Sequence, residues 1–227
     1  MTAYLFVLFA ACLISKVTAQ IIVNGQLFTQ GLAIVDSPAA DSTLHAGSNN
    51  SIAIDVSGDG KLPNWQTASV PGSDLSTRFD SLEIYLVSYQ TNLNLSVSQG
   101  PGLLEQESGS TVKHLNWAIP TCVPSGGYNL TFYEGSHING TAFFSITPLP
   151  LEIQNSQSSS SQCSDGVNTL RGAPQASSPP PLSPWLNTNG QVITEPSFPS
   201  ANGAGHALRS SSVCAVVVCG MLALGLM

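Results

Sequence analysis

Positive charge is scarce in this chain: only 6 of its 227 residues are Lys or Arg, against 13 Asp or Glu. The basic residues are scattered singly, whereas a phosphate-binding surface needs clustered Lys and Arg, so nucleic acid is excluded as an expected partner. The sequence also lacks a Gly-x-Ser-x-Gly nucleophile elbow and the short His or Cys spacings of metal sites. We therefore expect a protein that is not an enzyme and that carries no metal and no cofactor.

The sequence also lacks an apolar run of the ~20 residues that cross a membrane, but it has a shorter run at each end. Tyr4–Ile14 is apolar and precedes the small-residue pattern Val17-Thr18-Ala19, which is typical of a signal peptide. We predict that residues 1–19 are removed and that the mature chain begins at Gln20. An uncleaved signal anchor is the alternative, but the apolar run is short for one.

The second apolar run, Val213–Met227, extends to the last residue of the sequence. It follows a polar spacer, Gly205–Ser212, and the small residues Asn202-Gly203-Ala204. This order is the pattern of glycosylphosphatidylinositol (GPI) attachment. We predict attachment at Asn202 and removal of residues 203–227, with a short tail anchor as the alternative. The expected location is extracellular, on the outer leaflet of the plasma membrane or in a cell wall.

Cysteine is also scarce in the predicted mature chain. Of five cysteines, Cys12 leaves with the signal peptide, and Cys214 and Cys219 leave with the C-terminal segment. The remaining two, Cys122 and Cys163, are expected to form one disulfide because the compartment is oxidising. Two unpaired or intermolecularly bridged thiols are the alternative.

Short runs that alternate apolar and polar residues fill the first part of the mature chain. Period two is the signature of half-buried strands, and Gly and Pro turns separate the runs. Residues 20–153 are therefore predicted to form an immunoglobulin-like β-sandwich of about seven strands. Two of the runs are expected to pair as a hairpin that turns near residues 135–138 and brings Thr147 close to Gly126. The clearest runs are Ile52–Val56, Leu82–Leu86, Leu93–Val97, Tyr128–Tyr133 and Thr141–Thr147.

Four N-glycosylation sequons support an extracellular, surface-exposed module. Because a glycan cannot enter a core, a glycosylated Asn within a strand must point outward. Two of the four, Asn94 and Asn129, alternate with apolar residues of their predicted strands, as this requires. The fourth, Asn139, shares the parity of Ser145 and opposes that of Phe144, which places Phe144 in the expected core. The predicted glycosylation sites are Asn49, Asn94, Asn129 and Asn139.

The composition changes after residue 153. Between Gln154 and Ser200 there are 14 Ser or Thr and 7 Pro among 47 residues, with few large apolar side chains. Such a segment buries too little surface to offset its ordering entropy. Residues 154–202 are therefore expected to form a disordered, O-glycosylated stalk, in which Trp185 and Phe198 have no evident role.

Four aromatic residues are predicted to lie on the parity opposite the main core set: Tyr85, Tyr89, Tyr133 and Phe143. Aromatic rings outside a core can stack on sugar rings, which makes these residues candidate carbohydrate contacts. Packing beneath a loop or against a neighbouring sheet is the alternative explanation.

The order of these segments resembles a known family. A module with Ile34-Val35-Asp36-Ser37-Pro38 and a block Asn92–Ile146 containing GPGLLEQESGSTVKHLNW precedes the stalk and the GPI signal. This resembles fungal Ser/Thr-rich GPI-anchored cell-wall proteins, many of which carry a module similar to the N-terminal domain of the cell-wall β-1,6-glucan assembly family. The resemblance covers roughly residues 30–150. It implies wall association and a role in glucan organisation, and it transfers no active-site residue.

Two functions remain open at this point. The first is a structural or adhesive cell-surface glycoprotein, and the second is a carbohydrate-binding module that contacts cell-wall polysaccharide.

Overall fold

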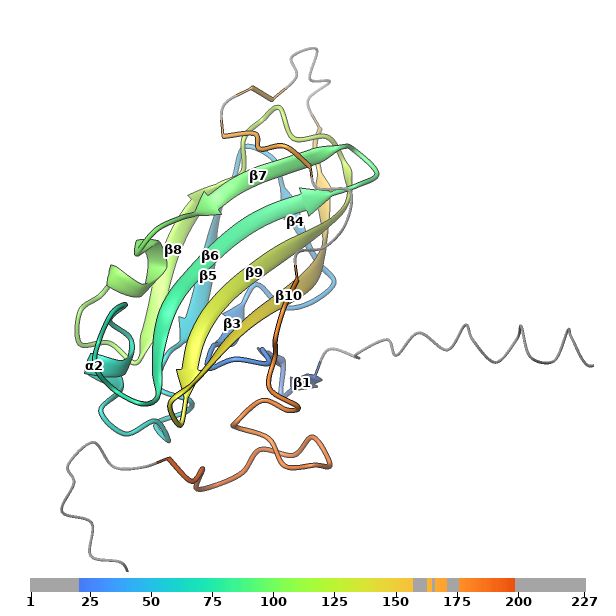
Figure 1. The fold of residues 1–227 in the computed structure, drawn as a ribbon. Helices are drawn as coiled ribbons and strands as arrows, with labels where there is room; N and C mark the ends of the chain where they lie inside the picture. The colour runs from blue at the N-terminus through green and yellow to red at the C-terminus, as the bar shows by residue number, and fades with distance from the viewer. Residues whose placement is uncertain (1–20, 157–162, 165, 171–175, 199–227) are drawn as a thin grey trace, which may run out of the picture.

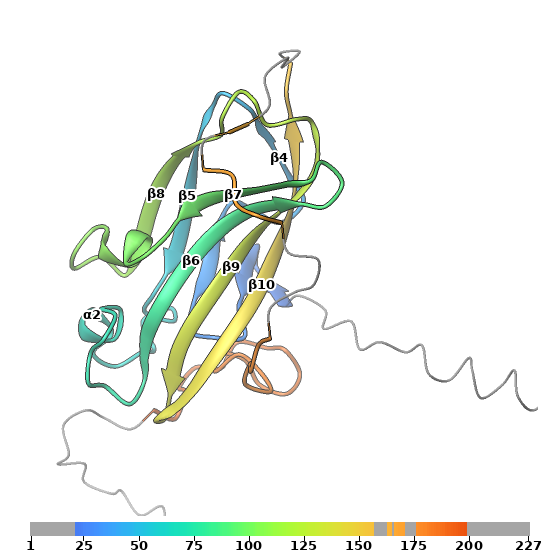
Figure 2. The same cartoon turned by 45° about the horizontal axis from the view of Figure 1, so that its top comes forward.

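The computed structural model describes residues 21–156, 163–164, 166–170 and 176–198. These residues form two five-stranded sheets that face each other in an immunoglobulin-like β-sandwich (Figures 1 and 2). The strand order is β1-β2-β3-β5-β8 in the first sheet and β4-β10-β9-β6-β7 in the second. The predicted fold class is therefore confirmed.

The described residues contain ten strands rather than about seven. The additional strands are short, so a period of two has too few residues to show in the sequence. One short α-helix, α2 (Trp65–Ala68), and one 3₁₀ helix, η2 (Gly102–Glu105), lie in the connections. The strands are β1 (Ile21–Val23), β2 (Gln26–Phe28), β3 (Ile34–Ser37), β4 (Ser42–His45), β5 (Asn49–Asp55), β6 (Arg78–Ser88), β7 (Leu93–Ser98), β8 (Val112–Ala118), β9 (Gly126–Ile138) and β10 (Thr141–Gln154).

The core lies between the sheets and follows the alternation of the sequence. On β6, the side chains of Leu82, Ile84 and Leu86 are fully buried, whereas the intervening residues face the outer side of the second sheet. On β9, Leu130 and Phe132 are buried in the same way. Apolar side chains from both inner faces interdigitate, as in other sandwiches.

The β9–β10 hairpin is longer than predicted, and its turn lies elsewhere. The turn is formed by Asn139 and Gly140, both with positive φ (52° and 81°), which is the backbone conformation of a two-residue type I′ turn. The strands pair from Ile138 opposite Thr141 to Gly126 opposite Ile153. The expected turn near residues 135–138, and with it the proximity of Thr147 to Gly126, is therefore wrong. Asn-Gly was the signal in the sequence that gives the correct register.

A buried carboxylate locks the loop between β2 and β3 to the second sheet. Glu134 on β9 is 0% exposed, and it accepts hydrogen bonds from the backbone N–H groups of Leu32 and Ala33 and from the Thr29 hydroxyl. Desolvation by burial raises the pKa of Glu134, although these donors favour the ionised form. A Cβ at Gly31 would overlap this carboxylate, so the loop needs glycine there.

The stalk prediction is wrong for the described residues between 176 and 198. Trp185 is 0% exposed, and its indole N–H donates to the carbonyl of Leu32 at 2.9 Å. The ring covers Gly58, where a Cβ would collide with it, and it contacts Phe198 edge-on at 5.4 Å between centroids. We call residues 183–198 the cap; it closes one end of the sandwich (orange to red in Figure 1). The Ser- and Pro-rich composition failed as a predictor because one buried Trp supplies the apolar surface that the rest lacks.

The predicted signal peptide (1–19), the predicted attachment residue Asn202 and the predicted C-terminal propeptide (203–227) lie outside the described residues. Within the described part of the chain, no helix has the length and apolar character needed to cross a bilayer.

Candidate functional site

An open groove of about 350 Å³ lies on the outer face of the second sheet, over β6, β9, β10 and β7. We call it the aromatic groove. Its floor is formed by outward-facing residues, and part of its wall comes from residues 168–170, which follow the disulfide. The lining residues that carry the argument are Tyr85, Tyr89, Asn94, Tyr133, Phe144 and Asn168.

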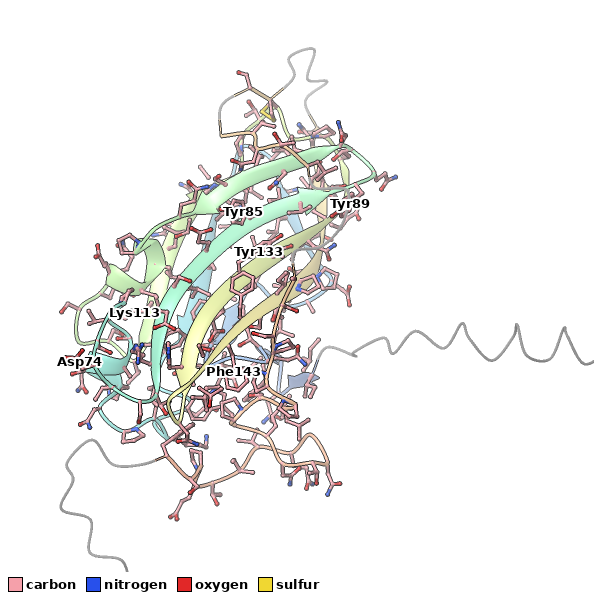
Figure 3. The ribbon with its side chains drawn as sticks, in the orientation of Figure 1. Asp74, Tyr85, Tyr89, Lys113, Tyr133 and Phe143 are labelled. Carbon is pink, nitrogen blue, oxygen red and sulfur yellow. A yellow bond between two sulfur atoms is a disulfide. The ribbon has the colours of Figure 1, made fainter. Side chains whose placement is uncertain are left out.

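Three half-buried rings cross the floor of the groove on adjacent strands. Tyr85 on β6 and Tyr133 on β9 meet edge to face, with 5.3 Å between ring centroids. Tyr133 and Phe144 on β10 are 6.4 Å apart and tilted by 39°. Tyr89, at the end of β6, also lines the groove and is 60% exposed. Figure 3 shows Tyr89, Tyr85 and Tyr133 along the face of this sheet. The rings therefore provide an apolar strip with π faces and edges open to a ligand.

The structure places three of the four predicted aromatic residues, Tyr85, Tyr89 and Tyr133, in the groove. The outward position predicted for the fourth, Phe143, is wrong. Phe143 pairs with Ser136, which is buried, so Phe143 belongs to the inward-facing row of β10 with Ser145. Phe144 takes the outward position instead. The observed parity of β10 is the reverse of the expected one. Phe144 and Ile146 face the outer side of the sheet, and in the sequence such apolar residues look like core residues. Asn139 is exposed because it lies in the turn, and not because of that parity.

Polar groups border the rings. The Tyr85 hydroxyl donates to Glu83 Oε2 at 2.8 Å and accepts from Gln99 Nε2 at 3.2 Å. Gln99 Nε2 also donates to Ser96 Oγ at 2.9 Å. A strip of rings with amide and carboxylate groups at its edge matches a polyhydroxylated ring, which has apolar C–H faces and polar edges.

The wall of the groove depends on the segment after the disulfide. The predicted bridge between Cys122 and Cys163 is confirmed. Beyond it, Gly166–Asn168 runs along the edge of β7: Ser96 N–H donates to Gly166 O at 3.1 Å, and Asn168 N–H donates to Asn94 O at 2.7 Å. The Asn168 side chain donates to Ser96 Oγ at 2.8 Å. Sequence reasoning missed this wall, because a three-residue edge pairing leaves no periodic pattern in a Ser-rich segment.

The four sequon asparagines lie in different surroundings. Asn49 and Asn139 are exposed. Asn94 and Asn129 are half-buried on the outer face of the second sheet, on either side of Val87, with which both pair. Asn94 lines the aromatic groove.

Two His–carboxylate pairs among the described residues lie outside the lining of this groove. Glu107 accepts hydrogen bonds from His114, which lower the pKa of the Glu107 carboxyl. His137 Nδ1 lies 2.6 Å from Asp80 Oδ2. In the described part of the chain, no three His, Cys, Asp or Glu side chains are arranged to hold a metal ion.

No protein-family model matches the sequence, and no curated protein matches it either. Part of the chain is similar to the crystal structure of red sea bream transglutaminase, at 14% identity and a TM-score of 0.32, over 52% of this chain and 16% of that one. It is also similar to fibronectin(III)-like modules of Clostridium thermocellum CbhA, at 16% identity and a TM-score of 0.24, over 54% of this chain and 46% of that one. The chain thus spans less than half of either structure, and no function is transferred from them.

Proposed function

We propose that this chain is a secreted, GPI-anchored cell-surface or cell-wall glycoprotein without enzymatic activity, whose aromatic groove binds cell-wall polysaccharide. The observation that carries the proposal is the row of Tyr85, Tyr133 and Phe144, with ring centroids 5.3 and 6.4 Å apart in an open groove. The acidic chain and the absence of a basic cluster favour an uncharged ligand.

Retention of the secreted chain on insoluble β-glucan, with chitin as a second matrix, tests the binding. We expect saturable retention, and about tenfold weaker retention for Tyr133→Ala, which corresponds to about 1.4 kcal/mol of lost binding energy. Val70→Ala is the control, because Val70 is 54% exposed and does not line the groove. Equal retention of both variants would reject the groove as the binding site. Absence of retention on either matrix would favour a purely structural or adhesive role.

The lipid anchor is tested separately. A GPI-specific phospholipase should release the chain from membranes, and Asn202→Leu combined with bulky residues at positions 203–205 should retain the uncleaved precursor. Release by high salt alone would contradict the anchor.

A further inference from the structure

Asn94, a predicted N-glycosylation site, is one of the residues that line the aromatic groove. In the β6–β7 pairing, Asn94 lies opposite Val87, and Ser96 lies opposite Tyr85. Residues on one face of an antiparallel pair contact their diagonal neighbours when the side chains are long or aromatic. Asn94 is therefore a diagonal neighbour of Tyr85, and Tyr89, which directly follows the last residue of β6, also lines the groove.

The carboxamide of Asn94 is compatible with this modification in the folded chain. Asn94 Nδ2 donates to the carbonyl of Thr169 at 3.3 Å, and Oδ1 is buried without a hydrogen-bond partner. N-glycosylation replaces one of the two N–H bonds of Nδ2. One N–H therefore remains on Nδ2 as a donor after glycosylation.

The groove has room for such an occupant. Its volume of about 350 Å³ lies at the lower end of the range of ~300–1,000 Å³ for ligand sites. Asn94 is one of the residues that line it, whereas Asn129, on the same face, is not. Val87, between the two, is only 9% exposed even though it faces outward, so the floor below Asn94 is a sheltered apolar surface.

We propose that the first sugars of an N-glycan on Asn94 pack in the aromatic groove against Val87 and Tyr85, and that this glycan regulates the access of external polysaccharide. The regulatory part rests on the function proposed above. A protein glycosylated at Asn94 binds polysaccharide more weakly, because its own glycan covers the Tyr85 and Tyr89 end of the groove. A protein without that glycan presents the whole row of rings.

The first experiment concerns the glycan alone and uses the secreted wild-type chain. Each sequon is followed by mass spectrometry during native digestion with a peptide-N-glycosidase. We expect the Asn94 glycan to be released about tenfold more slowly than the Asn129 glycan, because it must leave the groove before cleavage. Tyr85→Ala should remove this protection at Asn94 and leave the Asn129 rate unchanged. An unoccupied Asn94, or equal rates at the two sites, would overturn the proposal.

The second experiment concerns regulation. Asn94→Gln removes the sequon and keeps a side-chain amide, and Asn129→Gln removes a glycan from the same face as a matched control. We expect about tenfold tighter retention on β-glucan for Asn94→Gln and no change for Asn129→Gln. Unchanged retention of Asn94→Gln would refute the regulation. If neither variant nor the wild type binds glucan while the Asn94 glycan is still protected, the proposed function fails and the seating of the glycan stands.

Discussion

Replacement of Trp185 tests whether the cap is part of the fold. Trp185→Ala removes a fully buried indole, its contact with Gly58 and its 2.9 Å hydrogen bond to Leu32 O. A buried Trp→Ala change costs about 3–5 kcal/mol. For a domain of this size, 1 kcal/mol lowers Tm by about 2–4 °C, so we expect Tm to fall by about 6–20 °C.

The assay is thermal unfolding of the purified chain, with limited proteolysis as a second measurement. Trp185→Phe keeps most of the ring but leaves Leu32 O without its indole donor, which should cost about 1–2 kcal/mol. Leu182→Ala is the matched control, because Leu182 lies three residues away and is 36% exposed. It should change stability by no more than about 0.5 kcal/mol. If Trp185→Ala melts at the same temperature as Leu182→Ala and gains no new cleavage site in the cap, the reasoning is refuted.

Two further predictions concern the buried carboxylate and the disulfide. Glu134→Gln should lose about 1–3 kcal/mol at pH 7, because Nε2 in place of Oε2 leaves the Ala33 N–H without an acceptor. The raised pKa of Glu134 means that the folded state binds the proton more tightly, so the free energy of unfolding of the wild type should rise as the pH falls toward 5. Denaturant titrations at several pH values should give the variant a smaller slope of the free energy of unfolding against pH. Equal slopes would contradict this. Replacing both Cys122 and Cys163 by Ser opens a loop with a sequence separation of 41 and should cost about 4 kcal/mol, seen as a lower Tm; an unchanged Tm would show that the loop is held without the bridge.

Local sequence patterns predicted the parts of the fold whose strands bury only one face. On β6, the alternation of Leu82, Ile84 and Leu86 with outward residues correctly placed Tyr85 on the face opposite the core, because only one of the two faces is core. The disulfide could be predicted by elimination, since only two cysteines remain between the predicted terminal segments.

The pattern failed where both faces of a strand carry apolar residues. On β10, Phe144 and Ile146 face outward, whereas Ser145 and Thr147 face inward and are buried. Alternation with a period of two shows which face of a strand is buried only if the apolar residues lie in the core. On β10 the apolar residues instead lie on the floor of the groove and at the edge of the sheet. At this edge the N–H of Ser178 donates to Phe144 O. The same limit explains why Phe143 was predicted in place of Phe144.

Long-range contacts of the Ser- and Pro-rich segment could not be derived from composition. The edge pairing of Gly166–Asn168 and the insertion of Trp185 each depend on surfaces 70 or more residues earlier in the chain. A single Trp within a polar segment is a usable signal, because Trp is rarely left without a packing partner in a folded chain.

The cap also changes how far the module would stand from a membrane. A disordered stalk over residues 154–202 would separate the sandwich from the attachment point by a long flexible chain. The cap instead keeps the chain on the sandwich as far as Phe198, and Asn202 follows Phe198 by only four residue positions in the sequence. Fully extended, these residues span at most about 14 Å.

If Asn202 carries the proposed anchor, the end of the sandwich that carries the cap should therefore lie close to the bilayer. The last described residues of the cap and the β9–β10 turn lie at the same end of the molecule, and the disulfide lies toward the other (Figures 1 and 3). A fluorophore attached at Ala142, an exposed residue of β10 beside the β9–β10 turn, should thus be quenched by a headgroup-attached quencher in the anchored protein. The same fluorophore at Ser125, near the disulfide, is the control and should be quenched less. Equal quenching at both positions in the wild type would mean that the cap does not orient the module. Trp185→Ala should give equal quenching, because it releases the cap that shortens the connection to the anchor.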